Sequence, residues 1–168
     1  MQAFYLDHDP ALAAQALCDQ HVVKMPVEVA QVLSTAARLT KPSEECGRLY
    51  RATHEHHPVT RAVLADSGYR VWLCQHGVAC CEEYTHRFGK VHAALAILHA
   101  AAALLGITEV TVAPIRSGSV PLVMPEDLHS EDAVWSYRAF YTDKLVGWAD
   151  RESEARYTRR LPPCGWTG

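Results

Sequence analysis

The chain has 168 residues, 49% of them hydrophobic and 21% charged, which predicts a single folded domain over residues 1–168. The net charge of −3 and the pI near 6.3 exclude a basic surface over the whole chain, so nucleic-acid binding would need a local patch. No apolar run reaches the roughly 18 residues of a membrane span, and the first ten residues lack the basic start of a signal peptide. The six cysteines show no CxxC spacing, which favours reduced thiols in a cytoplasmic protein.

The first third of the chain reads as an arm, a long helix and a connector. We expect residues 1–8 to form an extended N-terminal arm. An Ala/Leu pattern then predicts a helix from Pro10 to about Arg38. Pro26 lies inside this pattern and removes a main-chain hydrogen bond, so a kink or split is expected there. Residues 40–58 are polar and predict a connector.

The middle of the chain predicts two further helices. A helical pattern covers about 59–87, with a break expected at 66–68. Gly89 follows as a plausible left-handed cap. An Ala-rich helix is then predicted over 90–105, ended by Gly106.

The last third predicts a long loop, one helix and a tail. Residues 107–129 contain three Pro and one Gly and predict a long loop. A fourth helix is expected from a Ser130 cap to about Trp148. Residues 151–168 read as a basic, coil-like tail. Because no period-2 pattern persists, the fold class expected is an all-α bundle of about four helices.

One helix face combines chemically active side chains. His21, Lys24, Glu28 and Gln31 recur at spacings of three, four and three. At about 3.6 residues per turn these side chains share one face. Such a stripe is consistent with a salt-bridged helix surface. It also supplies an acid, a base and an amine within two turns, which can transfer protons or form a covalent bond to a substrate.

A second cluster is the histidine-rich segment Thr53-His54-Glu55-His56-His57-Pro58. The HxHH spacing differs from that of HExxH metal sites, and no cysteine pairs with it. A solvated loop is therefore one interpretation, and a metal site is another. Hydrogen bonding of His54 and His57 to phosphate or base edges is a third.

Cationic side chains crowd the end of the second predicted helix. Arg87 and Lys90 flank Gly89 in the segment CEEYTHRFGKVH. Cations in a last helical turn favour the helix dipole, so ordinary capping explains them. The alternative is a rim that holds a phosphate.

An aromatic and basic face is predicted on the fourth helix. Tyr137, Arg138, Tyr141 and Lys144 share that face by their spacing. Arg beside aromatic rings can stack a nucleic-acid base. The tyrosines could equally form the edge of the core.

These blocks carry two resemblances. The chain resembles a family of small proteins that is common in phages and phage-like genomes. This resemblance is carried, in order, by YLDHDP, CDQHVVKMPVEVAQVLSTA, LYRATHEHHP, EEYTHRFGKVH, the MPED segment at Met124 and SYRAFY. The segment Asp19-Gln20-His21, followed seven residues after the histidine by Glu28, resembles the pyrimidine-dimer DNA glycosylases of the phage endonuclease V type.

The second resemblance implies a fold and a chemistry. It implies a single all-α domain whose extended N-terminus reaches the active site, with Glu28 as the catalytic carboxylate. It also implies that the chain's α-amine, here on Met1, attacks the sugar C1′. Val27 and Gln31 stand where that family carries arginines, and Lys24 is the nearby cation or a second candidate amine.

The leading hypothesis is a DNA glycosylase and abasic-site lyase that acts on a modified or damaged base without metal or cofactor. Glu28, His21, Lys24 and Met1 would be catalytic. Substrate binding would involve Gln31, His54, His57, Arg87, Lys90, Tyr137, Arg138, Tyr141 and Lys144. The expected partner is nucleic acid, with DNA favoured, or a nucleotide, and no membrane.

Three alternatives remain open at this point. The first is a phage enzyme that modifies a nucleotide or a DNA base in the same pocket. The second is a metal-dependent hydrolase centred on His54, His56 and His57. The third is a non-enzymatic phage binding protein, in which Glu28 would be structural. GxxxxGK[ST], GxGxxG and GxSxG are absent, which disfavours ATP, NAD and α/β-hydrolase chemistry.

Overall fold

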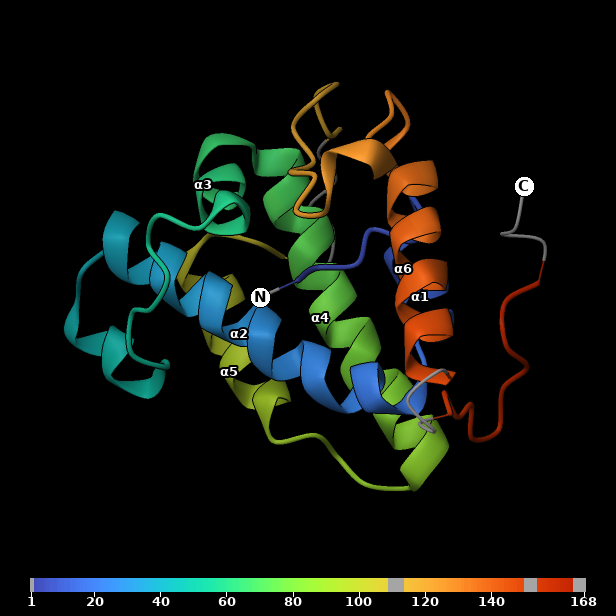
Figure 1. Ribbon diagram of the computed structural model, residues 1–168. Helices are drawn as coiled ribbons and strands as arrows, with labels where there is room; N and C mark the ends of the chain where they lie inside the picture. The colour runs from blue at the N-terminus through green and yellow to red at the C-terminus, as the bar shows by residue number, and fades with distance from the viewer. Residues whose placement is uncertain (1, 109–113, 150–153, 165–168) are drawn as a thin grey trace.

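The computed structural model describes residues 2–108, 114–149 and 154–164, and within them every regular element is a helix (Figure 1). The all-α prediction is confirmed. The elements in chain order are α1 (Pro10–Gln15), α2 (Asp19–Thr40), η1 (Glu44–Arg48), α3 (Pro58–Ala65), α4 (Ser67–Phe88), α5 (Ala94–Leu104), η2 (Glu126–Leu128) and α6 (Ala133–Ala149). The six α-helices in this part of the chain exceed the four expected, because two of the predicted helices are each divided.

The first predicted helix breaks at a different place from the one expected. α1 ends at Gln15, and α2 begins at Asp19 and runs through Pro26 to Thr40. Proline removes only one main-chain donor, and the residues packed around the buried Pro26 keep the helix continuous. The division therefore lies at residues 16–18, one helical turn before the polar stripe.

Capping residues define the other helix ends. Asp66 separates α3 from α4, and its carboxylate accepts the Tyr69 amide at 2.8 Å. Gly89 ends α4 with φ 68°, as its position predicted. The start of α6 is capped by Asp132, whose Oδ1 accepts the Val134 amide at 2.8 Å, instead of by Ser130.

The core forms where α2 packs against α4 and α5, with α3 and α1 beside them (Figure 1). Gly77 on α4 makes this packing close. A Cβ at that position would lie 2.7 Å from Val29 Cγ1 and 3.0 Å from a Leu98 methyl. Since Val29 follows Glu28 in α2, the close packing fixes the buried side of the helix that carries the polar stripe.

All six cysteines are free, which agrees with the reduced state expected; five are buried and Cys164 is exposed. None of the helices in the described residues is both long enough and apolar enough to span a membrane.

Candidate active site

The Glu28 carboxylate lies between a main-chain amide and an ammonium group. Its Oε2 accepts the Gln2 amide at 2.8 Å, and its Oε1 lies 2.8 Å from Lys24 Nζ. The Glu28 side chain is only 12% exposed, whereas that of Lys24 is 65% exposed. The helix spacing accounts for the Lys24 contact, and the Gln2 contact joins residues 26 positions apart. The carboxylate is thus oriented from two sides.

The N-terminal segment is anchored along its length. Residues 3–6 are buried, and the Phe4 ring packs on His21 of α2 and on Tyr141 of α6. Gln2 Nε2 donates to the Val123 carbonyl at 2.6 Å. The segment therefore lies between α2 and α6 and brings Gln2 to Glu28. Met1, expected as a catalytic residue, lies outside the described residues.

Arg138 holds the other end of this segment. Its Nε donates to the Leu6 carbonyl at 2.8 Å, and its Nη2 lies 2.9 Å from Asp7 Oδ2. The guanidinium expected to contact phosphate thus contributes two of its donors to the N-terminal segment.

His21 lies one turn before Lys24, on the side of α2 that faces α6. Its Nδ1 is 2.8 Å from the Tyr141 hydroxyl and 3.4 Å from Cys18 Sγ. Burial lowers the pKa of His21 to about 4, and the charges of Lys144 and Lys24 act in the same direction. The imidazole is therefore neutral at pH 7.

A cleft of about 270 Å³ opens beside His21. It is lined by Gln20, His21, Lys24, Lys144 and Trp148. The His21 and Trp148 rings lie 5.0 Å apart, and Lys144 Nζ is 5.7 Å from the centre of the Trp148 ring. Two ammonium groups thus flank an aromatic wall. Trp148 was not selected from the sequence, although its spacing of four from Lys144 on α6 could have indicated it.

The histidine-rich segment lies farther along α2. Thr35 Oγ1 accepts the Thr53 amide at 3.1 Å and donates to the Thr53 carbonyl at 3.0 Å, which ties the segment to the helix. Residues 52–57 line an open depression of about 560 Å³. Burial lowers the pKa of His57, and Glu28 acts on this pKa in the opposite direction, so His57 lies within the electrostatic reach of the carboxylate.

The described residues contain no set of side chains that could serve as the ligands of the metal-site alternative. There, no three His, Cys, Asp or Glu side chains are arranged to hold a metal ion. The His54 and His57 rings meet edge to face with their centres 6.3 Å apart, and His54 adopts φ 53°. Gln31, on α2, is half-buried.

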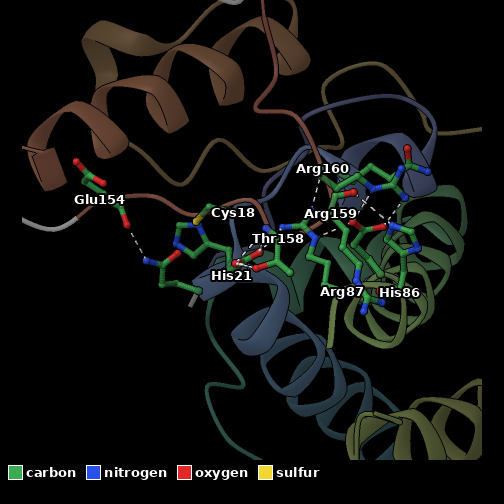
Figure 2. Close-up of polar contacts among 12 residues, drawn as sticks. Cys18, His21, His86, Arg87, Glu154, Thr158, Arg159 and Arg160 are labelled. Atoms are coloured by element: carbon green, nitrogen blue, oxygen red, sulfur yellow. Dashed lines mark hydrogen bonds and ion pairs between the residues drawn. The ribbon is translucent and has the colours of Figure 1, made fainter. Parts of the chain in front are cut away.

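Arg87 lies away from this site, in a buried charge network (Figure 2). Its side chain is 0% exposed, its Nη1 is 2.9 Å from Asp19 Oδ1, and its Nε is 2.7 Å from Glu83 Oε1. Arg160 from the tail binds both Glu83 oxygens at 2.8 Å. These contacts lower the pKa of both carboxyl groups against the effect of burial. The enclosed position of Arg87 does not fit the phosphate contact expected of it.

The remaining candidates are divided between surface and core. Lys90 is exposed in the turn after α4. Tyr137 and Tyr141 are both 0% exposed. The Tyr137 hydroxyl donates to the Pro121 carbonyl at 2.6 Å. Neither ring fits the base stacking expected of these tyrosines, because a ring with no exposed surface offers no face to a base.

The structure therefore places Glu28, Lys24 and His21 along α2, and Lys144 of α6 lines the cleft with His21 and Lys24. Gln2 contacts Glu28, and His57 lies within the electrostatic reach of Glu28. The structure does not bring Arg87, Lys90 or Tyr137 there. Two positioning contacts, Gln2 with Glu28 and Tyr141 with His21, had no local signal in the sequence.

Comparison with known proteins identifies the family of the chain. The family model described as pyrimidine dimer DNA glycosylase matches residues 1–96, a range that includes the N-terminal segment, α2 and α4. No curated protein and no solved structure is significantly similar to the chain. The match covers more than half of the chain, so the protein belongs to the pyrimidine dimer DNA glycosylase family, whose members' repair activity implies DNA as the substrate.

Proposed function

We propose that the protein removes a damaged base from DNA and cleaves the resulting abasic site, with Glu28 as the proton-transfer group and without a metal or cofactor. One observation carries this proposal: the Gln2 amide lies 2.8 Å from Glu28 Oε2. The start of the chain is thereby held at the only carboxylate on the polar face of α2. Family membership supports the same chemistry.

The reaction needs an amine and a proton acceptor close together. The amine nitrogen forms a bond to the sugar C1′ while the bond from C1′ to the base breaks, and the base leaves with the electron pair. The amine's proton passes to the Glu28 carboxylate, which can return it to the departing base or to the opened sugar ring. Opening of the ring gives an imine between the amine and C1′, and loss of a C2′ proton then expels the 3′ phosphate.

Two amines are candidates for the nucleophile. The α-amine belongs to Met1, which is bonded directly to Gln2 in the chain. The Lys24 ammonium lies 2.8 Å from Glu28 Oε1. In either case Glu28 is the group that can accept the proton.

Borohydride trapping tests this proposal, because borohydride reduces an imine to a stable covalent adduct. Duplexes carrying one thymine dimer or one abasic site are incubated with the protein and borohydride. We expect an adduct, and peptide mapping of it identifies Met1 or Lys24 as the attached amine. Glu28→Gln should slow strand cleavage by about 10²- to 10⁴-fold. Glu45→Gln, on the exposed surface of η1, is the matched control. Absence of an adduct on both duplexes, with Glu28→Gln as active as wild type, would refute the proposal.

A further inference from the structure

A segment of the long loop, residues 121–124, is held by α6. It contains no helix or strand. The Tyr137 hydroxyl donates to the Pro121 carbonyl at 2.6 Å. Burial raises the pKa of the Tyr137 phenol, and a main-chain hydrogen bond at Val123 acts in the opposite direction. The phenol thus contacts two residues of the segment, and because Tyr137 is 0% exposed it has little freedom to move.

His129 holds the far end of the same segment. Its Nε2 lies 3.0 Å from the Met124 carbonyl. Because a carbonyl oxygen can only accept a hydrogen bond, the imidazole nitrogen donates here. The segment is therefore fixed at both ends, at Pro121 and at Met124, although it belongs to no regular element. A loop held in this way can support another part of the chain.

The segment in turn holds Gln2. Gln2 Nε2 donates to the Val123 carbonyl at 2.6 Å, and Gln2 Oε1 is buried. Since only the amide nitrogen can donate to a carbonyl, this contact fixes the orientation of the carboxamide. The main-chain amide of the same residue donates to Glu28 Oε2 at 2.8 Å. Gln2 therefore connects the loop, through its side chain, with the candidate catalytic carboxylate, through its main chain.

The orientation of Glu28 matters for the proposed chemistry. A carboxylate that accepts a proton from the attacking amine must lie within hydrogen-bonding distance of it, and a small displacement lowers the rate. Lys24 contacts the other carboxylate oxygen, but its side chain is 65% exposed, and an exposed ion pair contributes little. The contact from Gln2 is therefore the stronger restraint on Glu28.

We propose that the segment 121–124 supports Gln2, and through it Glu28, so that Gln2 and Tyr137 are positioning residues for the proton-transfer step. The inference rests on the proposed function in that Glu28 performs the chemistry. Tyr137 and the segment lie outside residues 1–96, the range matched by the family model. The C-terminal part of the chain thereby helps to arrange a site whose carboxylate lies on α2.

Hydrogen exchange at the main-chain amide of residue 2 measures this support without DNA. Gln2→Met keeps the side-chain length but loses the donor to the loop, and Tyr137→Phe loses the donor that holds the loop. After correction for intrinsic exchange rates, we expect the protection of this amide to fall about tenfold in each variant, the equivalent of one hydrogen bond. Gln15→Met in α1 and Tyr84→Phe in α4 make the same substitutions elsewhere and should leave it unchanged. Unchanged protection in Gln2→Met overturns the inference, whether or not Tyr137→Phe folds.

Single-turnover trapping tests the effect on the reaction. Saturating abasic-site DNA is incubated with the protein and borohydride, and the rate of adduct formation is measured. Gln2→Met should slow this rate about tenfold, while its affinity for a duplex with a tetrahydrofuran abasic analogue, which cannot form an imine, stays within about twofold of wild type. Tyr137→Phe should act in the same direction, and Gln15→Met should match wild type.

Two outcomes of the trapping experiment overturn the inference. One is an unchanged rate in Gln2→Met, and the other is a slower rate with an equal loss of affinity, which would indicate a general loss of structure. If the wild-type protein forms no adduct, the proposed function fails, and the exchange measurement alone decides whether the loop supports Gln2.

Discussion

Arg87 on α4 and Asp19 at the start of α2 form an ion pair of 2.9 Å in which the arginine side chain is fully enclosed. The same guanidinium contacts Glu83, which in turn binds Arg160. Asp19 also accepts the Thr158 hydroxyl at 2.7 Å. Two helices and the tail therefore share one charge network, which fixes the end of α2 nearest His21 (Figure 2).

Removing the Arg87 guanidinium should lower the stability of the protein. Arg87→Met preserves most of the side-chain volume but leaves the Asp19 and Glu83 carboxylates buried with fewer partners. We expect the free energy of unfolding to fall by about 3 kcal/mol, measured by urea denaturation at pH 7. Arg48→Met, at an exposed position in η1, should change it by less than about 0.5 kcal/mol. Equal effects of the two substitutions would show that the network does not stabilise the fold.

The close approach of α2 and α4 leads to a second prediction, which concerns the stability of a Gly77 variant. A methyl group at Gly77 would lie 2.7 Å from Val29 Cγ1, so Gly77→Ala should lower the free energy of unfolding by about 1–2 kcal/mol despite the better helix propensity of alanine. Gly47→Ala meets nothing within 4 Å and serves as the control. Thermal unfolding of the two variants compares them, and a stabilised Gly77→Ala would contradict the packing described.

Two buried histidines predict a loss of stability in mild acid. Burial lowers the pKa of His21 and of His76 to about 4, whereas an unfolded histidine titrates near 6.5. As the pH falls below about 6.5 the unfolded chain binds protons that the native protein does not, so stability decreases down to about pH 4. Between pH 7 and pH 5 the expected loss is about 2 kcal/mol for each histidine.

Substitution of one histidine isolates this effect. His76→Gln keeps an amide that can reach the Pro10 carbonyl and should remove about half of the pH dependence between pH 7 and pH 5. His99→Gln, on the exposed face of α5, should retain all of it. Urea denaturation at the two pH values gives the comparison, and an unchanged pH dependence in His76→Gln would refute the assignment.

The attachment of the histidine-rich segment to α2 should depend on Thr35. Thr35→Val removes the hydroxyl that pairs with both main-chain groups of Thr53, leaving that amide without its partner. We expect a loss of about 1–2 kcal/mol in stability and faster hydrogen exchange at residues 53–57. Thr40→Val loses only a bond to the Ala36 carbonyl and is the control. Equal exchange in the two variants would show that Thr35 does not hold the segment.

Helix ends with local signals were predictable, and one without such a signal was not. Asp66 and Gly89 act through their own side chain or dihedral angle, so the break before α4 and its end were visible in the sequence. The break at residues 16–18 contains neither glycine nor proline. Cys18 instead donates its amide to Tyr141, 123 residues away, and no local pattern encodes such a contact.

In the candidate site, too, features with a local sequence signal were predictable and features set by distant segments were not. The stripe of His21, Lys24 and Glu28 follows from helical spacing, and the structure retains the Lys24–Glu28 pair. The surroundings of Arg87 and Tyr141 depend on distant segments, the tail and the N-terminal segment, which enclose side chains that resemble surface residues in the sequence. Spacing reveals which residues share a helix face, but it does not reveal what covers that face.

The burial of five thiols has a practical consequence. Burial raises the pKa of Cys74 to about 11 and that of Cys81 to about 12, so these thiols react slowly while the protein is folded. Cys164 alone is exposed. A maleimide dye added to the native protein should therefore attach at one position, in the tail beyond Arg160. Spectroscopic studies of DNA binding can then use a singly labelled protein without any prior cysteine substitution.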